Sequence, residues 1–106
     1  MINILVIKDK QNIVTIEATG HSGYAEAGRD IVCSAVSTLM QNLAVGLTEV
    51  LKKQAKIIID EEIPHMCVSL LDNDEKAQIL MQTTLLSLKE ITNGYSNYIK
   101  IKEKQR

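Results

Sequence analysis

The sequence is poor in aromatic residues and balanced in charge, and both features exclude classes of function. Its 106 residues include three tyrosines but no phenylalanine and no tryptophan. Proteins that bind single-stranded nucleic acid stack bases on aromatic side chains, so such a surface is not expected. Twelve basic and thirteen acidic residues give a net charge of -1, which supplies no excess of cations for a phosphate backbone. We therefore expect no direct nucleic-acid partner.

Long apolar runs and sorting signals are also missing, and cysteines are few. No apolar run approaches the ~20 residues that a membrane-spanning helix requires. The N-terminal stretch MINILVIKDK lacks the charged start and the small-residue cleavage site of a signal peptide. Two cysteines, Cys33 and Cys67, do not make a disulfide framework, and in a reducing cytosol both should be free thiols. These features predict a cytoplasmic protein with no membrane partner.

The pattern of apolar residues predicts five strands and two helices. The strands are expected over residues 2–8, 13–19, 55–61, 65–71 and 96–102. Helical periodicity begins at Asp30 and ends at Lys53, and a second helix follows residues 72–75 and ends at Gly94. The order is ββαββαβ, and the length fits a single domain over residues 1–106. We predict an α+β fold, with a mixed sheet and two helices packed on it.

Apolar positions mark the faces that should pack together. In the first helix they are Val32, Val36, Leu39, Leu43, Leu47 and Val50. In the second helix they are Ala77, Leu80, Thr84, Leu88 and Ile91. In the strand over 13–19 they are Val14, Ile16 and Ala18. In the strand over 65–71, Met66, Val68 and Leu70 should face opposite to His65, Cys67 and Ser69.

The segment GHSGYAEAGRDIVCSAVS, residues 20–37, joins the second strand to the first helix and is rich in reactive groups. Asp30 is well placed as the N-cap, which puts Cys33 at the third helical position. N–H groups of a first turn lack intrahelical partners and carry the positive end of the helix dipole, so a thiolate there is stabilised. An Asp30 carboxylate turned toward the thiol would oppose this effect, and we expect capping to occupy it.

A base for this thiol is available in the same segment. His21 stands at the start of the loop, and Gly20, Gly23 and Gly28 give the loop the freedom to fold back toward Cys33. A cysteine nucleophile needs such a base or imidazolium partner. The first-turn N–H groups could then hold an oxyanion.

Other interpretations of the same residues stay open. A lone cysteine on a helix is more often a packing residue, and a lone histidine near a strand end is more often a polar residue at the rim. Four residues could supply the number of ligands that a zinc site needs, namely His21, Cys33, His65 and Cys67. Their spacing in the sequence is not that of a zinc site, so no metal or cofactor is expected. Ser37, one turn after Cys33, either supports the site or simply lies on the helix surface. Tyr24 is an exposed loop residue unless the loop closes over a ligand.

The same eighteen residues resemble the signature of the ribosomal-processing cysteine protease family, Prp, which reads approximately GHAxYAxxGxDIVCAAVS. The resemblance assigns Cys33 as the nucleophile and His21 as its general base. It places four further residues on characteristic supporting positions, namely Gly20, Gly28, Asp30 and Ser37. Ser22 and Ser34 stand where alanine is usual, and these small replacements leave the dyad intact.

The resemblance implies a homodimeric cysteine endopeptidase that removes the N-terminal extension of ribosomal protein L27 by acyl transfer. The alternatives are a non-enzymatic ribosome-associated binding module and a redox sensor that uses Cys33. The loop from Ser22 to Arg29, small and rich in glycine, is expected to be a gate that orders over a bound peptide, with Tyr24 covering it.

Overall fold

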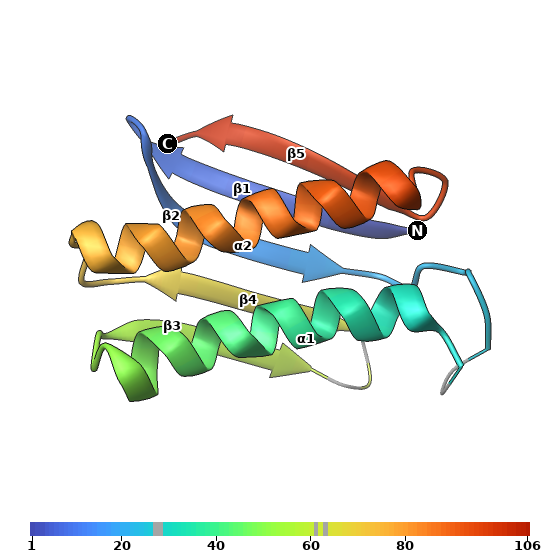
Figure 1. Ribbon diagram of the computed structural model, residues 1–106, viewed down its shortest axis with the longest axis horizontal. Helices are drawn as coiled ribbons and strands as arrows, with labels where there is room; N and C mark the ends of the chain where they lie inside the picture. Colours follow the sequence, from blue (N-terminus) through green and yellow to red (C-terminus); the bar gives the residue numbers. More distant parts are fainter. Residues whose placement is uncertain (27–28, 61, 63) are drawn as a thin grey trace.

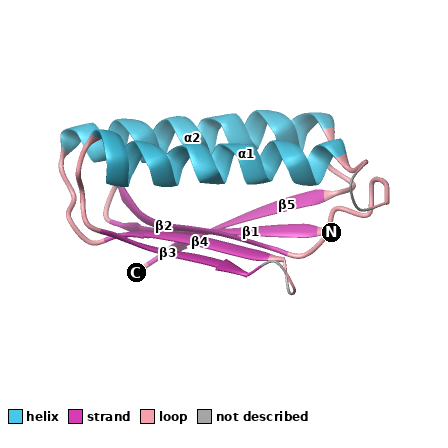
Figure 2. Ribbon diagram, turned by 90° about the horizontal axis from the view of Figure 1, so that it is seen from below, coloured by secondary structure: helices cyan, strands magenta, loops and turns pink. Residues whose placement is uncertain are grey.

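Two helices cover one face of a five-stranded sheet in the computed structural model, which describes residues 1–26, 29–60, 62 and 64–106 (Figures 1 and 2). The strands are β1 (Ile2–Asp9), β2 (Asn12–Thr19), β3 (Ala55–Asp60), β4 (His65–Leu70) and β5 (Ile99–Gln105). The helices are α1 (Ile31–Val45), continued by the π-helical turn η1 (Gly46–Val50), and α2 (Glu75–Gly94). The predicted α+β class, the order ββαββαβ and the mixed sheet with two helices on it are confirmed.

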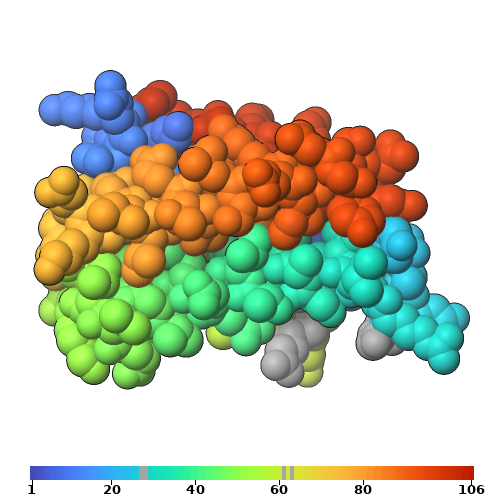
Figure 3. All heavy atoms as spheres, in the orientation of Figure 1, coloured from blue at the N-terminus to red at the C-terminus, as the bar shows by residue number. Residues whose placement is uncertain are grey.

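The sheet order is β3-β4-β2-β1-β5. All neighbouring strands are antiparallel except β1 and β5, which are parallel because the chain crosses over the sheet through α2 before β5. Among the described residues, no helix covers the other face of the sheet (Figure 2). On the covered face, α1 and α2 lie side by side, as the space-filling view also shows (Figure 3).

The face of β2 was only partly predicted, because the β1–β2 hairpin contains a bulge. Ile7 pairs with Thr15 and Lys8 pairs with Ile13, which leaves Val14 as the extra residue. Ile13 is consequently fully buried, whereas Val14 is half-buried. Ile16 and Ala18 are buried, as expected.

The helix faces follow the prediction until α1 changes its winding. Val32, Val36, Leu43 and Leu47 are buried as expected, and Met40, which the prediction left out, is fully buried. Val50 is 72% exposed rather than buried. A π-helix has more residues per turn than an α-helix. The side chain of Val50, at the end of η1, is therefore rotated away from the core.

The second helix and the last strand also differ in detail. The buried residues of α2 are Ala77, Met81, Thr84, Leu85 and Leu88, while Leu80 and Ile91 are half-buried. Strand β5 starts at Ile99 rather than at residue 96, because a turn precedes it in which the Tyr98 N–H donates to the Tyr95 carbonyl at 2.9 Å.

The stretch Ile31–Val50 is long and apolar enough, by length and composition, to cross a membrane, which the sequence analysis did not anticipate. Its apolar character has another explanation in the fold. One side of it supplies five residues to the core beneath the helices, namely Val32, Val36, Met40, Leu43 and Leu47.

Candidate active site

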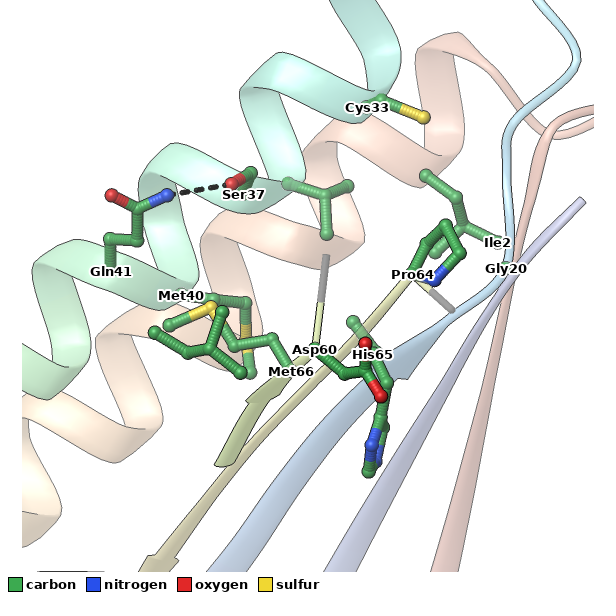
Figure 4. Close-up of a pocket in the computed structure, with 13 residues that line it drawn as sticks. Ile2, Gly20, Cys33, Ser37, Met40, Gln41, Asp60, Pro64, His65 and Met66 are labelled. Carbon is green, nitrogen blue, oxygen red and sulfur yellow. Dashed lines mark hydrogen bonds between the residues drawn. The ribbon is translucent and has the colours of Figure 1, made fainter. Parts of the chain in front are cut away.

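A cavity of about 270 Å³ lies between the first turns of α1 and the adjacent end of the sheet (Figure 4). Cys33 contributes to its wall, and the Cys33 side chain extends from α1 at the upper edge of the close-up. Most of the other lining residues are apolar: Ile2, Ala18, Val36, Met40, Ile59, Pro64 and Met66. The polar ones are Ser37, Gln41, Asp60 and His65. The thiol therefore lies beside a space that can receive an apolar side chain.

Helix capping fixes the backbone of Cys33. The Asp30 side chain accepts hydrogen bonds from the N–H groups of Val32 and Cys33, each at 3.0 Å, which confirms the predicted N-cap. The Asp30 carbonyl accepts from the N–H of Ser34 at 3.1 Å. These three N–H groups are already occupied, so the expectation that the first turn would hold an oxyanion is wrong for Val32, Cys33 and Ser34.

Ser22 connects the loop to both Asp30 and Cys33. Its N–H donates to Cys33 Sγ at 3.4 Å, and its hydroxyl donates to Asp30 Oδ2. The Ser22 hydroxyl also accepts from the Tyr24 N–H at 3.0 Å. Ser22 and Asp30 are both buried. No sequence pattern signalled this contact between a backbone donor and the sulfur.

The Asp30 carboxyl stays ionised because of these hydrogen bonds. Burial acts to raise its pKa, but the hydrogen bonds from Ser22 and Cys33 outweigh burial, and the pKa of Asp30 lies below its ordinary value. At neutral pH the carboxylate is thus an acceptor for the cap and for Ser22. The expected role of Asp30, capping, is the one that the structure shows.

The two histidines are placed differently. His21 is exposed, and no hydrogen bond or ion pair joins its imidazole to Cys33 within the described part of the chain. It nevertheless directly precedes Ser22, whose N–H reaches the sulfur. His65 lines the cavity, but its ring points away from Cys33 (Figure 4), and its Nε2 lies 2.7 Å from Glu17 Oε2. Of the two histidines, His21 is therefore the one whose neighbour in the chain contacts the thiol.

The glycines and Ser37 of the predicted site have distinct surroundings. Gly20 has φ of +92°, and a Cβ there would lie 2.5 Å from the Met1 carbonyl oxygen, so only glycine fits. Gly23 has φ of +75° and open space around it. Gly28 lies outside the described residues. Ser37 is exposed, lines the cavity and accepts a hydrogen bond from Gln41 Nε2 at 2.8 Å.

Tyr24 does not line the cavity. Its ring packs edge-on against Tyr95 and Tyr98, although it is 42% exposed. Together with the buried Ser22, this contact anchors the beginning of the loop, for which the sequence analysis expected few buried contacts. Ala27 and Gly28, in the second half of the proposed gate, lie outside the described residues.

The four residues considered for zinc do not converge. Cys67 alternates along β4 with the core residues Met66 and Val68, so it faces the side of the sheet that carries no helix, away from Cys33. Within the described ranges, no group of three or more His, Cys, Asp or Glu side chains could hold a metal ion.

The two free cysteines should differ in reactivity. Burial raises the pKa of the Cys67 thiol, and the nearby Glu17 carboxylate adds to that effect. Cys33 is more accessible and has a hydrogen-bond donor at its sulfur. Iodoacetamide at neutral pH should label Cys33 at least about ten-fold faster than Cys67, as measured by peptide mass spectrometry. In urea the two rates should converge, and equal rates in the folded protein would contradict the account.

The two helix caps offer a matched pair of variants. Asp74 caps α2 through the Ala77 N–H and pairs with Lys53 at 2.7 Å, away from the cavity. Asp30→Ala should lower the free energy of unfolding by about 1 kcal/mol, as for a lost cap, and Asp74→Ala should lower it as well. Only Asp30→Ala should also slow Cys33 labelling, since only Asp30 holds Ser22.

Because the pKa of each carboxyl is lowered by folding, the stabilisation from each cap is present above the unfolded pKa and is lost as the pH falls through the folded pKa.

The surroundings of Cys33 supply part of what a nucleophilic sulfur requires. Its backbone is fixed by a cap, a donor points at the sulfur, and an apolar space adjoins it. Cysteine hydrolases, which form a thioester with their substrates, are the class defined by such a thiol. The comparisons with known proteins agree, because a model of the family described as cysteine protease Prp matches residues 1–100. The chain belongs to this family and is a cysteine protease.

Relatives support the assignment over most of the chain. The ribosomal processing cysteine protease Prp of Staphylococcus aureus is 29% identical over 104 residues, covering 94% of this chain and 95% of the relative. That of Mycoplasma genitalium is 28% identical over 100 residues, covering 94% and 96%.

Solved structures agree with the fold as well. A crystal structure of an essential ribosomal processing protease Prp from S. aureus, in complex with a covalently linked product peptide, has a TM-score of 0.92 and 26% identity. The match covers 98% of this chain and 100% of that one. A crystal structure of a Streptococcus mutans protein has a TM-score of 0.89 and 32% identity, covering 100% of this chain and 96% of that one.

Proposed function

We propose that this cysteine protease removes the N-terminal extension of ribosomal protein L27, with Cys33 as the nucleophile and His21 as the general base. The observation that carries the proposal is the setting of Cys33, capped, bonded by the Ser22 N–H and open to an apolar cavity. The relatives' name, ribosomal processing cysteine protease, supports a ribosomal protein as the substrate. Crystal structures of the S. aureus relative with a substrate peptide and with a covalently linked product peptide support the peptide chemistry.

The proposed reaction is acyl transfer through a thioester. His21 takes the proton of the Cys33 thiol, and the resulting thiolate attacks the scissile carbonyl carbon, forming a C–S bond and a tetrahedral oxyanion. His21 donates a proton to the leaving nitrogen as the C–N bond breaks, then takes one from the water that hydrolyses the thioester. The exposed imidazole of His21 is free to turn toward the sulfur, because no described contact holds it elsewhere.

The oxyanion needs a donor other than the capped first turn. The Ser22 N–H, 3.4 Å from Cys33 Sγ, is a described donor beside the sulfur to which the carbon of the oxyanion would be bonded. A donor that lies on the sulfur in the free enzyme can move onto the oxyanion as negative charge leaves the sulfur. The apolar cavity beside Cys33 then favours an apolar substrate residue next to the scissile bond.

A synthetic peptide that covers the L27 extension and the residues after it tests this proposal. Incubation with the purified protein should yield two fragments by mass spectrometry, and Cys33→Ala should yield none. Membership of a protease family sets aside the non-enzymatic binding module. A protein that oxidises reversibly at Cys33 but leaves the peptide intact would support the redox sensor instead.

The proposal includes a cytoplasmic homodimer. Large apolar side chains are exposed on both helices, including Ile31 (53%) and Val45 (53%) on α1 and Ile79 (61%) and Leu86 (63%) on α2. Association of two copies through these helices would remove them from water. Light scattering at micromolar concentration should give twice the mass of 11.8 kDa, and a monomer mass there would contradict the dimer.

A further inference from the structure

All three tyrosines of the chain, which are its only aromatic residues, meet at the end of the molecule that holds the candidate active site. Tyr24 lies in the loop after β2, whereas Tyr95 and Tyr98 lie in the turn between α2 and β5, at the same end of the ribbon (Figure 1). The centroid of the Tyr24 ring is 5.6 Å from that of Tyr95 and 5.3 Å from that of Tyr98. The interplanar angles are 85° and 76°, which are edge-to-face contacts.

Tyr95 and Tyr98 belong to the rigid part of the fold. Both are half-buried and pack against the hydrophobic core. The Tyr95 N–H donates to the carbonyls of Ile91 and Thr92, and the Tyr98 carbonyl accepts from the Ile2 N–H at 2.8 Å. The two rings therefore form a fixed support, and Tyr24 is the residue by which the loop attaches to it.

From Tyr24, hydrogen bonds lead to the nucleophile. The Tyr24 N–H donates to the Ser22 hydroxyl, which donates to the Asp30 carboxylate, the cap of α1. The N–H of the same Ser22 donates to Cys33 Sγ. Loss of the ring contact would remove one of the contacts that fix this loop from outside its own segment; another is the Gly20 N–H, which donates to the Pro64 carbonyl at 2.9 Å.

We infer that Tyr24 is a positioning residue for the proteolytic reaction: docked on Tyr95 and Tyr98, it holds the Ser22 N–H on the sulfur of Cys33 and so fixes the backbone next to His21. This inference rests on the proposed function for its catalytic consequence. The docking itself is a property of the free enzyme and can be measured without substrate. The alternative role for Tyr24, direct contact with a bound peptide, is an outcome of the test below.

The first experiment is hydrogen exchange of the Ser22 and Tyr24 amides in the free protein. Tyr24→Leu removes a ring that is 42% exposed, so the variant should remain folded, which its thermal midpoint checks. The Ser22 amide should exchange about ten-fold faster than in the parent, because the loop opens more readily. Tyr24→Phe, which keeps the ring, should restore the parent rate. An unchanged Ser22 exchange rate in Tyr24→Leu would overturn the inference.

The second experiment separates positioning from substrate contact. Tyr98→Leu should accelerate Ser22 exchange and lower kcat as Tyr24→Leu does, with KM nearly unchanged in both. The double variant should be no worse than Tyr24→Leu alone, since Tyr24→Leu already removes the contact that Tyr98→Leu loses. If Tyr24→Leu instead raises KM while Tyr98→Leu leaves both constants unchanged, Tyr24 touches the substrate and the inference is wrong. If neither the parent nor any variant cleaves the peptide, the exchange rate of the Ser22 amide still shows whether Tyr24 is docked on Tyr95 and Tyr98.

Discussion

Replacement of Cys33 by alanine should reduce peptide cleavage to background while leaving the fold intact. Loss of a catalytic nucleophile in a hydrolase costs on the order of a million-fold in kcat. The structural cost is small, because Cys33 is only partly buried and the Asp30 cap binds its backbone N–H rather than its thiol. Cleavage followed by mass spectrometry and a thermal melt of the same sample measure both effects.

Cys67→Ala is the matched control for this result. Cys67 is buried on the helix-free side of the sheet, and burial raises the pKa of its thiol. Its replacement should leave kcat within about two-fold and instead lower stability slightly, as for loss of a small buried side chain. Comparable cleavage by Cys33→Ala, or loss of cleavage in Cys67→Ala alone, would show that the nucleophile has been misassigned.

Replacement of His21 by alanine should lower kcat by about 10²- to 10⁴-fold, the usual contribution of a general acid–base. The thermal midpoint should stay unchanged, because His21 is exposed and no described contact depends on its ring. These results would show that His21 acts as a proton donor in the reaction, although its imidazole is exposed to solvent in the free enzyme.

The second histidine provides the comparison. His65→Ala removes the pair with Glu17, whose side chains are 27% and 31% exposed, so a modest stability loss is expected. The rate of cleavage should remain near that of the parent, since the His65 ring points away from Cys33 (Figure 4). A large loss of kcat in His65→Ala with full activity in His21→Ala would reverse the assignment of the base.

The order and class of the fold could be predicted because they depend on local patterns. Alternation in the strands and three- and four-residue steps in the helices are set by backbone geometry. The errors arose where the backbone departs from regularity. The bulge at Val14 buries Ile13, and the π-helical turn exposes Val50. The bulge has no glycine or proline to mark it in the sequence, and the π-helical turn has only Gly46 at its start.

The site was predictable in its capping but not in its tertiary contacts. The cap at Asp30 follows from residue type and position, and the same cap removes the first-turn donors that the sequence analysis had assigned to the oxyanion. Contacts between Tyr24 and Tyr98, or between the backbone of Ser22 and a sulfur, depend on how distant segments meet. Sequence periodicity carries no information about them.

The most direct test is to capture the covalent intermediate. The protein is mixed with the L27 peptide, quenched in acid within the first turnover, and its intact mass is measured. The account predicts an adduct with the mass of the N-terminal fragment, mapped by peptide mass spectrometry to Cys33 and absent from Cys33→Ala. Cleavage in the presence of an adduct on another residue, or continued cleavage by Cys33→Ala, would contradict the central claim that the Cys33 thiolate cuts the peptide.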